Sequence, residues 1–386
     1  MRTNTYYSPT KVVFGLNSLE RLKDELKPFC FKRAMLITGA SMCKTEAYRR
    51  VKETLSSLGT VVEFTSVAPE PNSDIVNALA SEVRRERLDL VIGLGGGSTM
   101  DAAKLASLMA ANEKEPMKYF KGEPVARKGP AVITIPTIAG TGSEVTPITV
   151  IAEDKAKLAL SHQHLYPAIA IVDPALAVTA QPGPTASAGI DALCHAIESI
   201  MSLDSTPVTQ ALAADAISLV DEFIERAFCN GMDIEARNGL ALASFMAGVA
   251  FMNTGLCLAH GMAYTYAIEA NLPHGVSAAL AEPYVVVFNA PAIPEKINLI
   301  ASAMGVGMDT ISANELGHAV ADHLLELMCT LELPQSLEDI KLGDADPEPM
   351  VNDLVSNYSR FIAKNPRKPS QEDLLRLYES MSGDDE

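Results

Sequence analysis

The sequence predicts an α/β domain over residues 1–181 followed by an all-helical domain over residues 182–386. Up to about residue 180, short β-rich runs alternate with helical patterns, which is typical of a parallel sheet with crossover helices. After the Pro182-Gly183-Pro184 run, β-branched segments almost vanish and long Ala-, Leu- and Met-rich patterns follow. A chain of 386 residues also exceeds a typical domain of ~100–200 residues, so two domains are expected.

The strands of the first domain are predicted at residues 33–38, 61–65, 88–94, 131–135, 147–152 and 168–172. Between the second and third of these runs, Ser73 and Asp74 can cap a helix whose apolar residues recur at helical spacing. A succession of strand, helix and strand implies a parallel sheet. In the second domain, helices are predicted over residues 185–201, 206–228, 233–253 and 295–304.

Charge and composition exclude several classes of function. The chain has 31 Lys and Arg residues against 48 Asp and Glu, and its net charge of −17 repels nucleic acids and anionic membranes. The first residues contain no apolar run of a secretory signal, and no segment reaches the ~20 apolar residues of a membrane span. The six cysteines are widely spaced, which predicts free thiols. We therefore expect a cytoplasmic protein with neither nucleic acid nor membrane as a partner.

A glycine-rich loop, Gly93-Leu-Gly-Gly-Gly-Ser98, follows an apolar strand and precedes a helical pattern over residues 99–109. Glycines let the backbone approach a phosphate closely, and the amides of a helix N-terminus stabilise an anion. The loop is therefore a candidate pyrophosphate site. Its match to GxGxxG is imperfect because Ser98 holds the last position and the preceding strand is not the first. The alternative is a tight turn without a ligand.

A second loop of small and hydroxyl-bearing residues, 136–144, follows the next predicted strand. Two such loops at neighbouring strand ends would bracket a crevice, which is the usual ligand position in an open α/β sheet.

Four residues of the second domain form a candidate metal site. Asp191 and His195 are spaced i and i+4, which places them on one helix face. His260 and His274 follow, and the Asn271-Leu-Pro273 run is expected to end one helix and leave His274 at the start of the next. Three imidazoles and one carboxylate suit Fe(II) or Zn(II) rather than Mg or Ca. The remaining histidines, His162, His164, His318 and His323, are interpreted as surface residues.

With these residues, the sequence resembles the iron-containing alcohol dehydrogenase family over nearly the whole chain. The resemblance includes GGGST from Gly95, GTGSE from Gly140, GIDALCHAIES from Gly189, HGMAY from His260 and LPHGV from Leu272. It implies a dinucleotide-binding domain and a helical metal-binding domain, an architecture shared with dehydroquinate synthase, with the active site in a cleft between them. It also implies a homo-oligomer, commonly a dimer.

The resemblance assigns roles to particular residues. It gives Asp191, His195, His260 and His274 as the metal ligands, with iron as the expected ion and zinc as the alternative. The residues assigned to the nicotinamide cofactor lie in the two loops and beside them: Asn72, Gly95, Gly96, Gly97, Ser98, Thr99, Asp101, Thr137, Ile138, Thr141, Ser143 and Lys157.

The sequence departs from the family pattern at two positions. Many NAD-using members carry an aspartate after the strand at residues 33–38, where it would repel a 2′-phosphate, but this chain has Gly39 followed shortly by Ser41. We therefore expect NADP(H) to be accepted at least as well as NAD(H). Many members also carry a histidine where this chain has Tyr264, one turn after His260. We name Tyr264 and His260 as catalytic candidates, with packing of the site wall as the alternative role for Tyr264.

The implied activity is the interconversion of a primary alcohol or diol and its aldehyde, by hydride transfer with NAD(P)(H) and with the metal as a Lewis acid. One alternative is a related metal-dependent reaction on the same fold, such as polyol oxidation by a glycerol dehydrogenase or the dehydroquinate synthase reaction. The latter needs a basic pocket, and residues 185–275 contain only Arg226 and Arg237 as strong bases. Another alternative is a silent nucleotide-binding protein, which the complete set of four candidate ligands disfavours.

Overall fold

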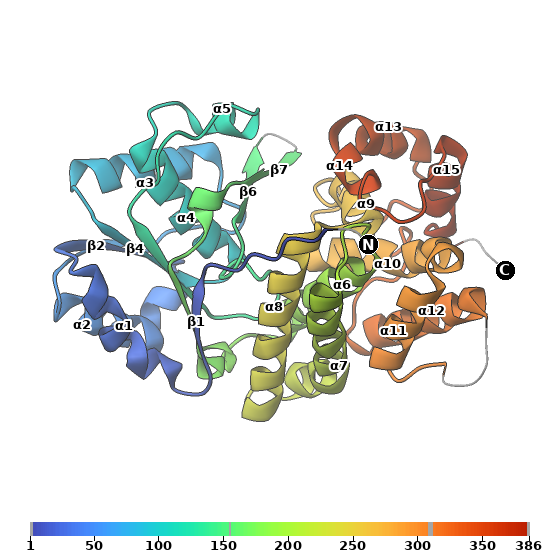
Figure 1. The fold of residues 1–386 in the computed structure, drawn as a ribbon, viewed down its shortest axis with the longest axis horizontal. Coiled ribbons are helices and arrows are strands. Elements are labelled where there is room, and N and C mark those ends of the chain that lie inside the picture. The colour runs from blue at the N-terminus through green and yellow to red at the C-terminus, as the bar shows by residue number, and fades with distance from the viewer. Residues whose placement is uncertain (1–2, 154–155, 308–311, 384–386) are drawn as a thin grey trace. The chain divides into compact units, whose positions relative to one another are not determined.

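The computed structural model describes residues 3–153, 156–307 and 312–383. The chain folds into two compact units, Ser8–Ala180 and Gln181–Glu386, and the residues before Ser8 belong with the second (Figure 1). The backbone N–H of Tyr7 donates to Asn253 Oδ1 at 2.8 Å, which ties the start of the chain to a helix of the second unit. The sequence predicts this segment as part of the α/β domain, and the difference arises because a contact so distant along the chain leaves no local pattern.

The α/β unit contains a six-stranded parallel sheet. In spatial order its strands are β1 (Lys11–Phe14), β8 (Ile169–Val172), β5 (Ala131–Pro136), β4 (Leu90–Gly95), β2 (Arg33–Ile37) and β3 (Thr60–Phe64). One face packs against α1 (Leu22–Leu26) and α2 (Glu46–Ser56), and the other against α3 (Ser73–Arg85) and α4 (Gly97–Ala111). Because both faces are covered, the central strands are continuous apolar runs, and the predicted parallel α/β fold is confirmed.

One predicted strand lies outside this sheet. Residues 147–152 correspond to β6 (Ile148–Glu153), which pairs antiparallel with β7 (Ala156–Ser161), a strand that the sequence analysis did not predict. Burial alternates along β6, so only one of its faces is covered, and a half-covered strand suits an antiparallel hairpin rather than a central parallel position. A short helix, α5 (Pro116–Phe120), completes the regular structure of this unit.

The second unit is helical, as predicted. Its helices are α6 (Pro182–Met201), α7 (Pro207–Cys229), α8 (Ile234–Thr254), α9 (Leu258–Tyr266), α10 (His274–Asn289), α11 (Pro294–Ala303), α12 (Ala313–Thr330), α13 (Pro347–Asn357), α14 (Ser359–Ile362) and α15 (Gln371–Ser380). Helices α6, α7 and α8 pack on one another, and α10 packs on α6 and α9 (Figure 1). The Pro182-Gly183-Pro184 run, interpreted as a domain boundary, forms the first turn of α6. Proline is tolerated there because the N–H groups of the first turn have no partner within the helix.

In the part of the chain that the structure describes, no single helix is long and apolar enough to cross a membrane. By length and composition alone, the pair α8 and α9, bent by 100°, passes the test together.

Candidate active site

The helical unit brings the four candidate metal ligands together. Asp191 and His195 lie one turn apart on α6, His260 lies on α9, and His274 is the first residue of α10. Each offers one donor atom, and these atoms all lie within 4.8 Å of one another. Asp191, His195 and His260 are buried, and His274 is partly buried. Three separate helices therefore supply one compact set of donors.

Close packing between α10 and α6 positions His274. A Cβ atom at Gly275 would lie 2.1 Å from the Ser187 carbonyl oxygen and 2.6 Å from Asp191 Cβ. Only glycine permits this approach without a shift of the backbone. The preceding chain turns at Asn271, whose φ of 51° is left-handed, so that α10 starts at His274 as the sequence predicted. The glycine after the histidine is thus a requirement of the packing.

Two buried polar atoms of this cluster fit a bound cation. Asp191 Oδ1 and His260 Nε2 have no hydrogen-bond partner among the described residues, and they lie 3.8 Å apart. His195 Nε2 lies 3.7 Å from the same carboxylate oxygen. These separations exceed a hydrogen bond but suit donors that share one ion, because metal–ligand bonds of about 2.0–2.2 Å place neighbouring donors roughly 3–4 Å apart. The residues present therefore fit a transition metal.

The charges of the cluster also favour a cation. Burial by itself raises the pKa of Asp191, but the imidazoles of His195, His260 and His274 hold it below its ordinary value. Burial by itself lowers the pKa of His260, but Glu198 and Asp191 raise it to about 10. A metal ion that binds this cluster therefore competes with protons for the imidazole nitrogen atoms.

Glu198 on α6 supports His260 from behind. Its carboxylate accepts from the backbone N–H groups of Cys257 at 2.7 Å and His260 at 3.0 Å, and its Oε2 lies 3.0 Å from His260 Nδ1. The carboxylate thus satisfies amides in the first turn of α9 and directs His260 Nε2 into the cluster. The sequence analysis missed this role. The signal was present, since Asp191, His195 and Glu198 follow an i, i+4, i+7 pattern on α6.

Tyr264, one turn after His260 on α9, lies beside the candidate metal ligand His274. The centroid of its ring is 5.6 Å from that of His274. The Tyr264 ring also stacks on Tyr358, with centroids 5.1 Å apart, and on Phe361, with centroids 5.6 Å apart. The ring is therefore both a neighbour of a candidate ligand and part of a packed aromatic group.

The other histidines lie outside this cluster. His318 on α12 is exposed, and His162 and His164 are partly buried and meet edge to face with centroids 4.7 Å apart. His323 is also partly buried and forms an ion pair with Asp221, which raises its pKa.

In the α/β unit, the two glycine-containing loops emerge side by side. Strands β4 and β5 are parallel neighbours with Gly95 opposite Pro136, and the N–H of Thr137 donates to the Gly95 carbonyl oxygen at 3.1 Å. The loops also touch further out, since a Cβ atom at Gly97 would lie 2.8 Å from Thr141 Cγ2. The expected position at neighbouring strand ends is confirmed, with the first turn of α4 facing the same edge.

Two residues assigned to the cofactor take part in a buried network. Ser143 Oγ donates to Asp101 Oδ1 at 2.6 Å, and Lys104 Nζ lies 2.6 Å from the same hydroxyl. Asp101 Oδ2 also accepts from the N–H of Val150 on β6 at 2.9 Å. Lys104 is fully buried, and burial lowers its pKa. This network fastens α4 to the second loop and to the hairpin.

The remaining residues assigned to the cofactor lie near the same edge. Asn72 caps α3 by accepting from the N–H of Ile75 at 3.1 Å. Lys157 on β7 is buried and forms an ion pair of 2.5 Å with Glu70. The N–H of Glu70 in turn donates to Ser98 Oγ at 3.2 Å. After β2, Gly39 is partly exposed and Ser41 is exposed. Gly96, Thr99 and Ile138 belong to the two paired loops. These loops approach closely, since a Cβ atom at Gly96 would lie 3.3 Å from Ile138 Cγ2.

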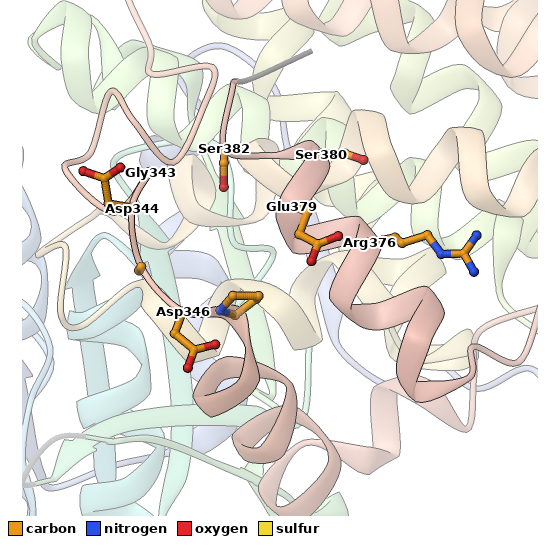
Figure 2. Close-up of a pocket in the computed structure, with 9 residues that line it drawn as sticks. Gly343, Asp344, Asp346, Arg376, Glu379, Ser380 and Ser382 are labelled. Carbon is orange, nitrogen blue, oxygen red and sulfur yellow. The ribbon is translucent and has the colours of Figure 1, made fainter.

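A surface hollow of about 580 Å³ lies elsewhere on the helical unit, between the start of α13 and the end of α15 (Figure 2). Its lining includes Asp344, Asp346, Glu379 and Arg376, and none of the four candidate ligands. An acidic hollow with one arginine has no group suited to hydride transfer, so the candidate site remains the cluster on α6, α9 and α10.

Comparisons with known proteins cover both units. Residues 9–174 match the family described as iron-containing alcohol dehydrogenase, and residues 185–382 match the C-terminal domain of the Fe-containing alcohol dehydrogenase family. The chain belongs to the iron-containing alcohol dehydrogenase family. The resemblance drawn from the sequence is thereby confirmed, and so is the alcohol and aldehyde chemistry: the protein is an oxidoreductase that interconverts an alcohol and its aldehyde.

Several relatives of this alcohol dehydrogenase match along their whole length. Long-chain-alcohol dehydrogenase 1 of Geobacillus thermodenitrificans is 32% identical, with 95% of this chain and 93% of that protein covered. The structure of a 1,3-propanediol oxidoreductase superposes with a TM-score of 0.92 at 30% identity, over 98% of this chain and 100% of the other. The structure of sulfoacetaldehyde reductase of Bifidobacterium kashiwanohense, solved with NAD⁺, superposes with a TM-score of 0.89 at 26% identity, and the match covers 100% of both chains.

Proposed function

We propose that this alcohol dehydrogenase holds Fe(II) through Asp191, His195, His260 and His274, and that it interconverts a primary alcohol or diol and its aldehyde with NAD(P)(H). The proposal rests on the set of donor atoms within 4.8 Å of one another, of which Asp191 Oδ1 and His260 Nε2 have no hydrogen-bond partner among the described residues. The metal supplies Lewis-acid chemistry at the substrate oxygen, and the nicotinamide carries the hydride. The family supports iron, whereas the donor set suits iron and zinc alike.

The side chains around the metal centre have separable tasks. Asp191 contributes the one anionic donor, and its buried position leaves its charge largely unscreened by water. Glu198 fixes the ring of His260 in the tautomer that presents Nε2. Tyr264, together with Tyr358, forms an aromatic wall next to His274.

Reconstitution tests this proposal. Metal-free protein, loaded anaerobically with Fe(II) or with Zn(II), is supplied with NADH or NADPH and a panel of aldehydes, and consumption of the reduced cofactor is followed. We expect Fe(II) to restore turnover. Equal rates with and without metal would contradict the assignment of the metal.

We propose that NADP(H) is accepted at least as well as NAD(H). Gly39 at the end of β2 leaves no carboxylate to repel a 2′-phosphate, and the exposed Ser41 can donate a hydrogen bond to it. The Bifidobacterium relative solved with NAD⁺ shows that a protein of this fold binds the unphosphorylated cofactor. Both cofactors therefore need to be compared directly.

Replacing Gly39 with aspartate is expected to weaken NADPH binding by about 1–3 kcal/mol through repulsion between like charges. A Cβ at this position lies 3.3 Å from the Val67 carbonyl oxygen, so any side chain requires a small local adjustment. Gly39→Asn makes the same steric demand without the charge and is the matched control. Fluorescence titration of both variants with NADPH and NADH measures the effect. Equal NADPH affinities for the Asp and Asn variants, or strict use of NADH by the natural protein, would show that position 39 does not select the cofactor.

We propose that the Tyr264 hydroxyl positions the substrate or a proton-relaying water. A phenol carries protons less readily at neutral pH than an imidazole, so a hydrogen-bonding role suits it better than that of a shuttle. Tyr264→Phe keeps the stacked ring and is expected to lower kcat/KM for aldehyde reduction roughly three- to tenfold, the value of one hydrogen bond. Tyr264→His is expected to retain activity with a changed pH profile. If the Phe variant matches the natural protein at every pH, the residue only packs the wall.

We also propose that the protein is a cytoplasmic homodimer acting on a small-molecule substrate. The family resemblance supports the dimer, and all six cysteines are free thiols, which suits a reducing compartment. Light scattering after gel filtration tests the dimer.

A further inference from the structure

An arginine lies against the aromatic group that contacts the candidate metal ligand His274. This group, the aromatic cluster, consists of Tyr264, Tyr358 and Phe361, and each of its rings is buried. The guanidinium carbon of Arg360 lies 4.4 Å from the ring centroid of Phe361, 5.7 Å from that of Tyr358 and 5.9 Å from that of Tyr264. Arg360 itself is exposed. Its charged end therefore meets solvent while three rings support its flat face.

The aromatic cluster connects Arg360 to the candidate metal centre. Tyr264 stacks on the other two rings of the cluster and also contacts His274, with the Tyr264 and His274 centroids 5.6 Å apart. One aromatic ring thus lies close to both groups, since the Tyr264 centroid is 5.9 Å from the guanidinium carbon and 5.6 Å from the His274 centroid. A molecule of a few carbon atoms that lies along this ring can therefore extend from one group toward the other.

Arg360 also differs from three other arginines of its unit in its ionic partners. Arg226, Arg367 and Arg376 each form an ion pair with a carboxylate. In the described ranges of the chain, no carboxylate lies within ion-pair distance of Arg360. When a guanidinium stacks on aromatic rings, its N–H donors still point outward in the plane of the group, where two of them can hydrogen-bond to one oxyanion.

We propose that Arg360 determines specificity for an aldehyde that carries an anionic group, carboxylate or sulfonate, at the end remote from the carbonyl. The carbonyl would lie at the metal centre, the carbon chain along Tyr264 and Phe361, and the anion at the guanidinium. This inference rests on the proposed function of the metal centre and adds the class of substrate. The relative described as a sulfoacetaldehyde reductase acts on an aldehyde of this kind.

A matched pair of substrates tests the inference. Succinic semialdehyde and butanal have chains of equal length and differ by the carboxylate, and kcat/KM is measured for each with the Fe(II)-loaded protein. We expect the natural protein to prefer the semialdehyde at least tenfold. Arg360→Met should lower that preference at least tenfold, mainly by raising KM for the semialdehyde, and Arg360→Lys should retain part of it. The ratio of kcat/KM for sulfoacetaldehyde to that for propanal, compared with the ratio for the first pair, shows whether a sulfonate is preferred to a carboxylate.

Arg376→Met is the control, because Arg376 is an exposed arginine of the same unit that already pairs with Glu372 on α15. It should leave the preference unchanged. The inference is overturned if the natural protein reduces butanal as efficiently as the semialdehyde. It is also overturned if Arg360→Met lowers kcat/KM equally for both substrates. A salt titration of the natural protein provides a check that needs no variant, since KM for the semialdehyde should rise with ionic strength while KM for butanal stays constant.

Failure of the metal assignment can be told apart from failure of this inference. If no aldehyde is reduced with either cofactor, the proposed function is wrong. Calorimetric titration of the protein with succinate then decides the role of Arg360 without turnover. Binding that Arg360→Met weakens at least tenfold would support an anion site, and equal binding by both proteins, or none by either, would exclude it.

Discussion

His274→Ala is expected to strip the protein of tightly bound metal and to lower kcat by about two to four orders of magnitude. The imidazole is one of four donors within 4.8 Å of one another, and alanine leaves that position to water. Losing several kcal/mol of Lewis-acid stabilisation corresponds to this range, at about 1.4 kcal/mol per factor of ten. Metal content by mass spectrometry and the rate of cofactor consumption are the two measurements.

The control for this variant is His318→Ala, at an exposed histidine of α12 outside the cluster. His274 is the first residue of α10 and only partly buried, so the alanine variant should keep its fold, which circular dichroism can verify. Unchanged metal content together with an unchanged rate would refute the ligand assignment.

Glu198→Gln is expected to weaken metal affinity by about 10- to 100-fold, the usual consequence of removing the partner of a ligating histidine. The carboxylate meets three donors on α9, namely two backbone N–H groups and His260 Nδ1. An amide of the same size can accept with only one of its two ends, so at least one buried donor loses its partner, at a cost of about 1–3 kcal/mol in stability. Competition with a chelator measures the metal affinity, and thermal unfolding of the metal-free protein measures the stability.

Glu282→Gln is the matched control for Glu198→Gln. Glu282 is fully buried, has no hydrogen-bond partner among the described residues, and has a pKa that burial and the nearby Glu198 raise well above its ordinary value. Glutamine has nearly the same size and shape, so this variant changes a buried glutamate that makes none of the hydrogen bonds to His260 and Cys257. Equal metal affinities for the Glu198 and Glu282 variants would show that the bonds to α9 do not govern the metal site.

Much of this architecture follows from local patterns. The helices predicted over residues 206–228 and 233–253 correspond to α7 and α8 within one residue at each end, because helical periodicity depends on neighbours within one or two turns. The pairing of Asp191 with His195 and the start of α10 at His274 have the same origin, since an i, i+4 spacing and a proline before the helix are local signals.

Other features depend on contacts that no local pattern records. The sequence shows β6 as a strand but not its partner β7, which has no β-branched residue. Glu198 meets α9 about 60 positions further along the chain, and Arg360 reaches Tyr264 from α14. Periodicity tells which side chains share a face of one element. Which elements meet is decided by close packing of their surfaces, such as the contact of Gly275 with α6, and that packing exists only in the folded protein.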